Sequence, residues 1–406
     1  GYIAPPLADP TADFQRWVAI SVASPPDGAL LQGVIDELTN FHSAIGIDIA
    51  KTTPAPMLVE NGWADDYTPP EIGGLRMYRY LRGLDPDANI SLQLTDWGHP
   101  RSKGKRADAI AQHTQATGFL DHYVRGRGTA PAPGSVTAYL QTCPLTDERS
   151  PGPFTAASWH ALHPGEVRFG ADAEQTITNL SSEPATDLQI DPVTATPCAA
   201  LGAGEGSGVA VFRHEAHREF TVLGLPTVDL DVVTSGAYGR LISRLWDEGP
   251  DGTRTLITRG VYRLEPDQTG HVTFQLFGGG WRFEPGHTAR LDIAGGELPF
   301  FKPAELPFTA RISNVRIALP THERPDGGEI QRNSHAPPER CRTMITVRLR
   351  RAASKVVVRS GGHARRVRHA KRGTLRLPVS GHHATVKIRY RGGRVRRIHR
   401  GLCGWV

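Results

Sequence analysis

The sequence predicts a multidomain protein in which a parallel α/β unit is followed by an all-β sandwich and a small basic β-domain. Three observations support this fold class. Helical and strand-like apolar patterns alternate up to about residue 134, short alternating segments fill residues 135–320, and residues 341–406 are strongly basic. A chain of 406 residues is long enough for several hydrophobic cores, and its 44 glycines and 32 prolines indicate many turns.

The first part of the chain alternates helices and strands. Residues 1–52 have apolar residues at helical spacing, and PAPMLVENGW then predicts a buried strand. Thr68 to Glu71 has the pattern of a capping box that opens a helix through about Arg82. A strand at Ile90 to Leu94 and a helix at about 107–123 follow. The order strand, helix, strand, helix is typical of a parallel sheet.

Residues 135–320 have the texture of a β-sandwich, and we expect a jelly roll. In RLISRLWDEGPDGTRTLITRGVYRL, residues 240–264, two alternating segments flank Pro-Asp-Gly, which predicts a hairpin. Residues 321–340 are polar and rich in Pro and Gly, and are interpreted as a linker. Residues 341–406 alternate again and predict a β-domain of four or five strands.

The charge of the chain is unevenly distributed. Residues 341–406 hold 19 Lys and Arg and no Asp or Glu, whereas residues 1–340 hold 28 basic and 41 acidic residues. No apolar run approaches the roughly 20 residues that a membrane-spanning helix needs, so we expect no membrane span.

The four cysteines fall into two pairs without the spacing of a zinc site. Cys143 and Cys198 lie in the middle region, and Cys341 and Cys403 bracket the basic tail. Two disulfides are favoured over four free thiols. If they form, the compartment is oxidising and the protein is secreted or at the cell surface.

An acid and a histidine follow consecutive predicted strands. Asp65 comes just after the strand in PMLVENGW, and His99 comes five residues after Leu94. In parallel sheets, functional groups gather at the carboxyl edge. A buried carboxylate at that edge would orient the imidazole of a neighbouring histidine. Asp66 and Asp96 are the competing acids, with Asp65 favoured. Taken singly, each residue is also compatible with a loop or surface role.

This order of acid and histidine is the closing half of the Ser, acid, His series of α/β-hydrolases. None of the serines lies in a Gly-x-Ser-x-Gly elbow. The sequence therefore predicts the C-terminal part of a serine hydrolase, a fragment whose nucleophile lies upstream of Gly1.

Longer stretches carry a family resemblance. PMLVENGWADDYTPPE, LTDWGH, FLDHYVRG, VTAYLQTCP, RLWDEGPDGTRTLITRGVYRL and FQLFGGGWRFEPGHTARLDI resemble the cocaine-esterase and Xaa-Pro dipeptidyl-peptidase family. The resemblance covers roughly residues 1–320. It implies a partial α/β-hydrolase domain over 1–134, with the end of a helical cap over about 1–52, and then a jelly-roll sandwich of the galactose-binding-like type. It implies serine-type cleavage of esters, amides or Xaa-Pro peptides through an acyl-enzyme, with Asp65 as the acid and His99 as the base.

Other candidate sites are weaker. His214 and His217 lack further ligands nearby, so we expect no metal and no cofactor. Rather than a sugar platform, we expect sandwich core, or residues that face the hydrolase domain, at Trp246, Trp281, Phe283, Phe300 and Phe301.

The basic tail suggests a polyanion partner, and an anionic cell-envelope polymer is favoured over nucleic acid, although a merely solvated face is an equal alternative. A non-catalytic protein that binds a surface polymer through the sandwich and the tail is the rival to the hydrolase.

Overall fold

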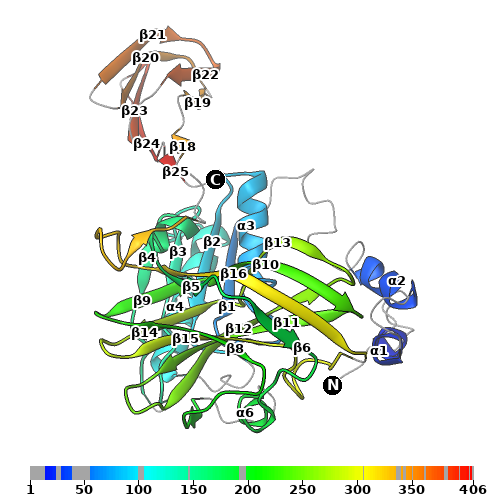
Figure 1. Cartoon of the computed structure of the whole chain (residues 1–406). Coiled ribbons are helices and arrows are strands. Elements are labelled where there is room, and N and C mark those ends of the chain that lie inside the picture. Colours follow the sequence, from blue (N-terminus) through cyan, green and yellow to red (C-terminus); the bar gives the residue numbers. More distant parts are fainter. Residues whose placement is uncertain are drawn as a thin grey trace. The chain divides into compact units, whose positions relative to one another are not determined.

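The computed structural model describes residues 14–23, 29–38, 55–98, 105–144, 147–191, 198–304, 306–334, 340–341, 344–349, 351–360, 363–378, 383–392, 394–401 and 403–404. The chain forms two compact units, residues 1–333 and 334–406 (Figure 1). The division falls inside the predicted linker. None of the helices in these described ranges is long and apolar enough to cross a membrane.

Strands dominate the described structure, and helices are few. The helices are α1 (Phe14–Ala23), α2 (Ala29–Glu37), α3 (Gly74–Leu84), α4 (Arg106–Tyr123), α5 (Trp159–Leu162) and α6 (Pro184–Gln189). The strands of the first unit are β1 (Met57–Gly62), β2 (Ile90–Thr95), β3 (Val136–Ala138), β4 (Phe154–Ala156), β5 (Gly165–Ala171), β6 (Gln175–Thr178), β7 (Ala200–Leu201), β8 (Ala210–Glu215), β9 (Phe220–Gly224), β10 (Thr227–Gly236), β11 (Gly239–Glu248), β12 (Arg254–Leu264), β13 (Thr269–Gln275), β14 (Gly279–Phe283), β15 (Thr288–Ala294), β16 (Phe308–Thr321) and β17 (Gln331–Arg332).

The α/β part contains one four-stranded sheet in the order β1-β2-β3-β4. The first three strands are parallel and β4 is antiparallel. Strand β2 is buried along its whole length, as expected for a central parallel strand, and α3 runs beside β1 and β2 (Figure 1). Strands β3 and β4 extend this sheet past residue 134, where the sequence placed the domain boundary.

The start of α3 differs from the sequence prediction. The helix begins at Gly74, with Gly73 as its N-cap, instead of at the capping box that begins at Thr68. The Asn61 Oδ1 atom accepts a 2.6 Å hydrogen bond from the Gly74 amide, while the Thr68 hydroxyl donates to Asp65. The capping box is absent because the Thr68 side chain, which would have capped the helix, is hydrogen-bonded to Asp65 instead.

Two larger sheets, both antiparallel, follow. One has eight strands, with the path β13-β10-β16-β5-β17 and β6, β9 and β14 joined to it, and the other has the order β7-β12-β11-β15-β8. A single hydrophobic core contains residues of both sheets, among them Phe220, Leu245, Phe283, Leu291 and Ile317. The predicted hairpin is present: β11 pairs with β12, and Glu248 lies opposite Arg254 across the turn.

The second unit is a separate β structure. Its strands are β18 (Arg340–Cys341), β19 (Met344–Leu349), β20 (Ala353–Ser360), β21 (His363–Ala370), β22 (Gly373–Pro378), β23 (His383–Tyr390), β24 (Val395–Gly401) and β25 (Cys403–Gly404). They form two pairs, β18-β25 and β19-β22, and a sheet in the order β21-β20-β23-β24. Val356, Val358, Val386 and Ile388 are the centre of its small core.

Candidate active site

The candidate site lies at the carboxyl edge of the parallel sheet. Strands β1 and β2 run side by side with Gly62 opposite Thr95, so the loops that leave them start at the same edge. The Trp63 amide donates a 2.9 Å hydrogen bond to the Thr95 carbonyl just beyond the strands. Asp65 lies in the first of these loops, and the second loop leads to His99.

The two loops are in direct backbone contact, and glycines make that contact possible. A Cβ atom on Gly62 would lie 1.9 Å from the Trp97 carbonyl oxygen, and one on Gly98 would lie 2.0 Å from the Ala64 carbonyl oxygen. Real Cβ atoms do not approach backbone this closely, so no larger residue fits at either position. The residue after Gly98 is His99, which lies outside the described residues.

Asp65 is buried, with only 3% of its surface exposed. Its Oδ1 atom accepts hydrogen bonds from the amides of Tyr67, at 3.2 Å, and Thr68, at 3.1 Å. Its Oδ2 atom accepts a 2.8 Å bond from the Thr68 hydroxyl. These three bonds come from its own loop and fix the direction of the carboxylate, which is what an acid that orients a histidine requires.

The two competing acids are engaged with basic side chains. The Asp66 Oδ2 atom lies 3.7 Å from a guanidinium nitrogen of Arg259. The Asp96 Oδ2 atom lies 3.2 Å from the ammonium of Lys105, which is buried, and accepts a 3.2 Å hydrogen bond from the Thr142 amide. Both carboxylates therefore neutralise a buried cation, which is a structural task.

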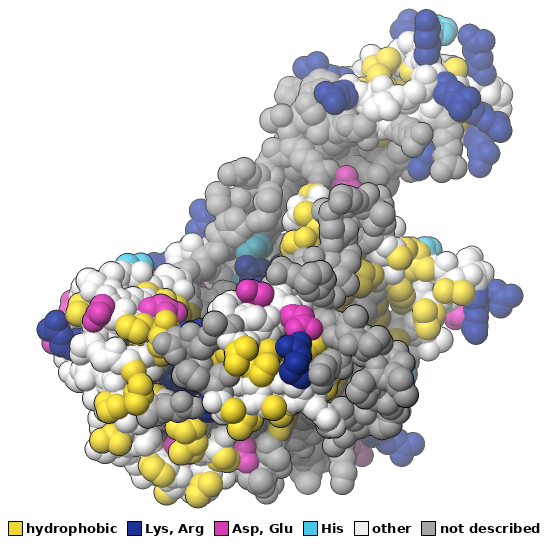
Figure 2. Space-filling model, turned by 90° about the vertical axis from the view of Figure 1, so that its right-hand side faces the viewer, with side chains coloured by type: hydrophobic (Ala, Val, Ile, Leu, Met, Phe, Trp, Pro, Cys, Tyr) yellow, Lys and Arg dark blue, Asp and Glu magenta, His cyan; other side chains and the backbone are white. Residues whose placement is uncertain are grey.

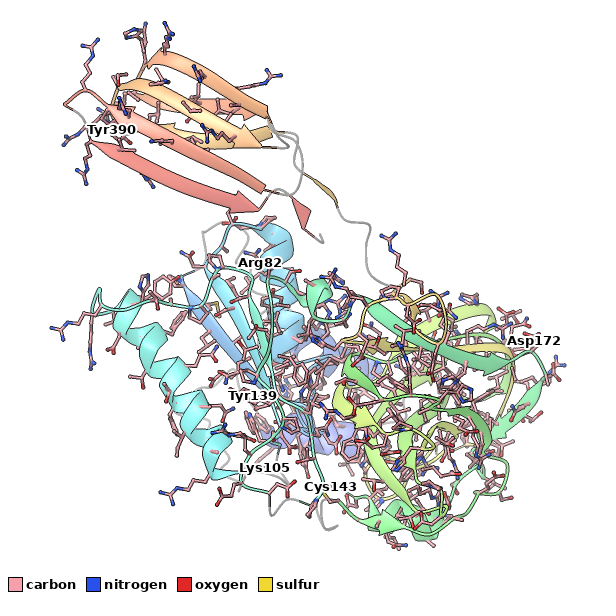
Figure 3. The ribbon with its side chains drawn as sticks, turned by 90° about the vertical axis from the view of Figure 1, so that its left-hand side faces the viewer. Arg82, Lys105, Tyr139, Cys143, Asp172 and Tyr390 are labelled. Atoms are coloured by element: carbon pink, nitrogen blue, oxygen red, sulfur yellow. A yellow bond between two sulfur atoms is a disulfide. The ribbon has the colours of Figure 1, made fainter. Side chains whose placement is uncertain are left out.

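Segments beyond the parallel strands support the loop that carries Asp65. Trp63 is buried, its Nε1 atom donates a 2.8 Å hydrogen bond to the Tyr139 carbonyl, and its ring lies against Gly280 of β14. The Glu71 amide donates a 3.2 Å bond to the Phe277 carbonyl. Figure 3 labels Tyr139, and also Cys143, on the segment that follows β3. The acid loop is thus held between its own sheet and the eight-stranded antiparallel sheet.

Arg259 of β12 is a residue of this region that the sequence did not reveal. It is 2% exposed, contacts Glu297 and Asp66, and donates a 2.7 Å hydrogen bond to the Ile190 carbonyl. Burial lowers the pKa of its guanidinium, but Glu297 and Asp66 outweigh burial, so the pKa is raised above its usual value. Its partners come from distant parts of the chain, so no local pattern could have shown them.

The remaining predicted candidates have structural roles. The His214 Nε2 atom lies 2.8 Å from a Glu329 oxygen, and no cluster of three or more metal-ligating side chains occurs among the described residues. Trp246, Trp281 and Phe283 are buried, which confirms that they are core residues. Phe300 and Phe301 pack edge to face, 4.6 Å apart.

One disulfide is present among the described side chains. Cys143 and Cys198 are bonded, with Cα atoms 5.4 Å apart, as the sequence predicted. In the tail, Cys341 and Cys403 lie directly opposite each other in the register of β18 and β25. Their side chains lie outside what the structure describes, so the second bridge stays a prediction.

Part of the sequence matches the model of a known protein family. Residues 128–309 match the model of the X-Pro dipeptidyl-peptidase C-terminal non-catalytic domain. No curated protein matches the chain at a significant level.

Three solved structures share its fold. They are an aminopeptidase from a marine sediment Thaumarchaeota archaeon (16% identity, TM-score 0.52), an α-amino acid ester hydrolase (16%, 0.53) and a CocE/NonD family hydrolase from Staphylococcus aureus (10%, 0.51). The matches cover 77%, 78% and 76% of this chain but only 60%, 62% and 62% of those chains. The chain therefore spans about three-fifths of their length. Over residues 128–309 this chain thus resembles the Xaa-Pro dipeptidyl-peptidase C-terminal domain, and it shares the fold of these three hydrolases.

Proposed function

We propose that this chain is the C-terminal part of a serine hydrolase that cleaves esters, amides or Xaa-Pro peptides through an acyl-enzyme. The observation that carries the proposal is the buried, triply hydrogen-bonded carboxylate of Asp65, in a loop whose neighbour leads to His99. The family likeness supports the same reaction class. The antiparallel sheets of residues 165–332 would be its C-terminal jelly roll.

In this proposal, the roles of the two residues follow from ordinary triad chemistry. His99 would remove the proton from a serine hydroxyl as the serine oxygen attacks the carbonyl carbon. Asp65 would accept a hydrogen bond from the imidazole and stabilise the imidazolium that forms. His99 would then protonate the leaving group, and water would hydrolyse the acyl-enzyme. The nucleophile and the oxyanion hole would come from the nucleophile-bearing part of the complete hydrolase domain.

Exposed apolar side chains on the first two helices support the same proposal. Phe14, Val18 and Val22 of α1 are 53–69% exposed, and Leu30 of α2 is 69% exposed. Amphipathic helices normally bury such a stripe against another layer. In the proposed complete hydrolase, the nucleophile-bearing part of the domain would cover it.

Labelling with a fluorophosphonate probe tests the hydrolase. The chain alone should show no stoichiometric serine labelling, because triad chemistry requires the nucleophile. The same chain preceded by its upstream coding sequence should label, and Asp65→Asn should lower its kcat by roughly 10³–10⁴-fold. Asp66→Asn is the matched control, with an expected loss below about ten-fold. Stoichiometric labelling of the chain alone, or an active Asp65→Asn enzyme, contradicts the proposal.

A second candidate function is supported by the tail. Its 19 basic and no acidic residues suggest attachment to an anionic cell-envelope polymer, with or without hydrolysis. The Cys143–Cys198 bridge supports the related proposal that the protein is secreted or at the cell surface, since disulfides persist in oxidising compartments. A thiol assay on protein from the native host tests this proposal. Free thiols at both Cys143 and Cys198 would contradict it.

A further inference from the structure

The four-stranded sheet of the second unit has two chemically opposite faces. Side chains alternate along a strand, and directly opposed residues of neighbouring strands share a face. One face presents Val356 and Val358 of β20 and Val386 and Ile388 of β23 to the small core. The register of the same strands defines what lies on the other face.

The second face is rich in cations. Arg368 lies opposite Lys355, which lies opposite Arg389, so three cations form one row across β21, β20 and β23. The next row is Arg366, Val357 and Lys387. Arg359 lies one row further along β20. These side chains are exposed, apart from a half-buried Lys355, and basic side chains project from this unit in Figure 2. We call the six cations the basic face: Lys355, Arg359, Arg366, Arg368, Lys387 and Arg389.

This arrangement is unfavourable for the unit by itself. Like charges directly opposite each other on a sheet destabilise it, and the row of three contains two such pairs. Residues 341–406 contain no Asp or Glu that could neutralise them. An external anion would relieve the repulsion. It would have to carry several negative charges to pair with all the cations of the face.

The spacing of the face indicates a linear polymer. Opposed side chains within a row have Cβ atoms about 4.5–5.5 Å apart, and successive rows on one face are roughly 7 Å apart. A chain with one negative charge on each short repeating unit meets several of these cations at once. The face is part of an antiparallel sheet, and the described residues of this unit include no helix that could enter the groove of a duplex.

We propose that the basic face binds a linear phosphodiester polymer that carries no bases. Four of its six cations are arginines, whose planar guanidinium groups bind phosphate in a bidentate manner. The described residues of the face include no aromatic side chain on which bases could stack. Tyr390, labelled in Figure 3, packs against the small core instead. This inference rests on the polymer-binding part of the proposed function and is independent of its hydrolase part.

Binding titrations with the full chain test the proposal. The probes are poly(glycerol phosphate), poly-glutamate and oligo-deoxythymidine with equal numbers of charges, at 50 and 200 mM salt. The face variant is Lys355→Gln/Arg368→Gln/Arg389→Gln. The matched control is Lys371→Gln/Arg372→Gln/Arg376→Gln, which removes the same three charges from exposed positions at a turn and on β22. Circular dichroism confirms that both variants are folded.

We expect poly(glycerol phosphate) to bind most tightly and the face variant to lose roughly ten-fold or more in affinity. The slope of log K against log salt should weaken by about 2, and the control should change less than about three-fold. Equal losses in the two variants would overturn the site. Equal or tighter binding of poly-glutamate or oligo-deoxythymidine would overturn the choice of polymer. Absence of binding to all three probes would overturn the polymer-binding part of the proposed function as well, while leaving the labelling test unaffected.

Discussion

Arginine has opposite surroundings in the two units of the molecule. In the first unit Arg244, Arg254, Arg259 and Arg290 are at most 2% exposed, and each contacts carboxylates. In the second unit the arginines of the basic face are exposed, and they lie within residues 341–406, which contain no acidic residue. A buried guanidinium requires a partner within the fold, because an unpaired buried charge is too costly. An exposed cation without an internal partner remains available to an external one.

The interior charges of the first unit form one network on β11, β12 and β15. The Arg244 Nη1 atom donates a 2.7 Å bond to Asp187, and Asp292 accepts bonds from Arg290 Nε, at 2.8 Å, and Trp246 Nε1, at 2.9 Å. Asp292 is fully buried. Since every charge there depends on its neighbours, the removal of one member leaves others unpaired in the interior.

The largest expected effect comes from breaking this network. Asp292→Ala should destabilise the first unit by about 3–5 kcal/mol, because it removes one carboxylate partner of buried Arg244 and Arg290 and the acceptor of the Trp246 N–H. Urea unfolding measures the change. Glu174→Ala is the control, since its pair with Arg311 is about half exposed and should contribute at most about 1 kcal/mol. Equal losses in the two variants would show that the network contributes no more than a surface pair.

The second prediction concerns how the basic unit holds together. Its core is small and the 19 basic residues of residues 341–406 repel one another, so we expect a Cys341–Cys403 bridge, for which the register is suitable. In the chain-entropy model, a loop of about 60 residues gives roughly 4 kcal/mol. Cys341→Ser should therefore melt the second unit well before the first, in a calorimetric scan with two transitions. An unchanged second transition would exclude the bridge.

The sequence predicted most elements whose apolar residues have a regular period. Both helices of residues 14–37, the strands β1 and β2 and the hairpin of β11 and β12 are present. It did not identify β21 or β24 individually. In HARRVRHA, for example, only Val367 and Ala370 pack against the core, so the binary pattern is almost all polar. Pairing with β20 and β23 forms these strands, and that contact is not local.

In the candidate site, too, the sequence predicted some features and not others. The rule that functional groups follow parallel strands led to Asp65, and the structure gives it a buried and fixed carboxylate. Nothing local indicated that Arg259, nearly 200 residues later, would lie beside Asp66, or that Thr68 would bond Asp65 instead of capping a helix. A contact of long sequence separation decided the first, whereas in the second two local patterns three residues apart compete for the same threonine.

The third prediction concerns the pH dependence of the stability of the first unit, in which a buried histidine has a shifted pKa. Burial, with help from His160 and Arg79, lowers the pKa of His163 to about 3, and its Nδ1 atom lies 3.0 Å from the Asn333 amide nitrogen. Between pH 6.5 and 3, His163 is protonated in the unfolded chain but stays neutral in the folded chain. Stability should therefore fall with decreasing pH by roughly 1.4 kcal/mol per pH unit for this histidine. His163→Gln should remove that slope between pH 6.5 and 5 in urea titrations, and an unchanged slope would refute the assignment.

The smallest expected effect has the opposite sign to the first. Lys355 lies between Arg368 and Arg389, so Lys355→Gln removes two repulsive cross-strand pairs. Each such pair costs roughly 0.2–1 kcal/mol, and the second unit should become more stable by a similar amount at low salt. Salt screens exposed charges, so the gain should shrink at 0.5 M salt. The measurement is the midpoint of the second calorimetric transition at both salt concentrations. A gain in stability together with weaker polymer binding would mean that this row of cations is retained for a partner at the expense of the fold, whereas a loss of stability at low salt would show that Lys355 serves the sheet itself.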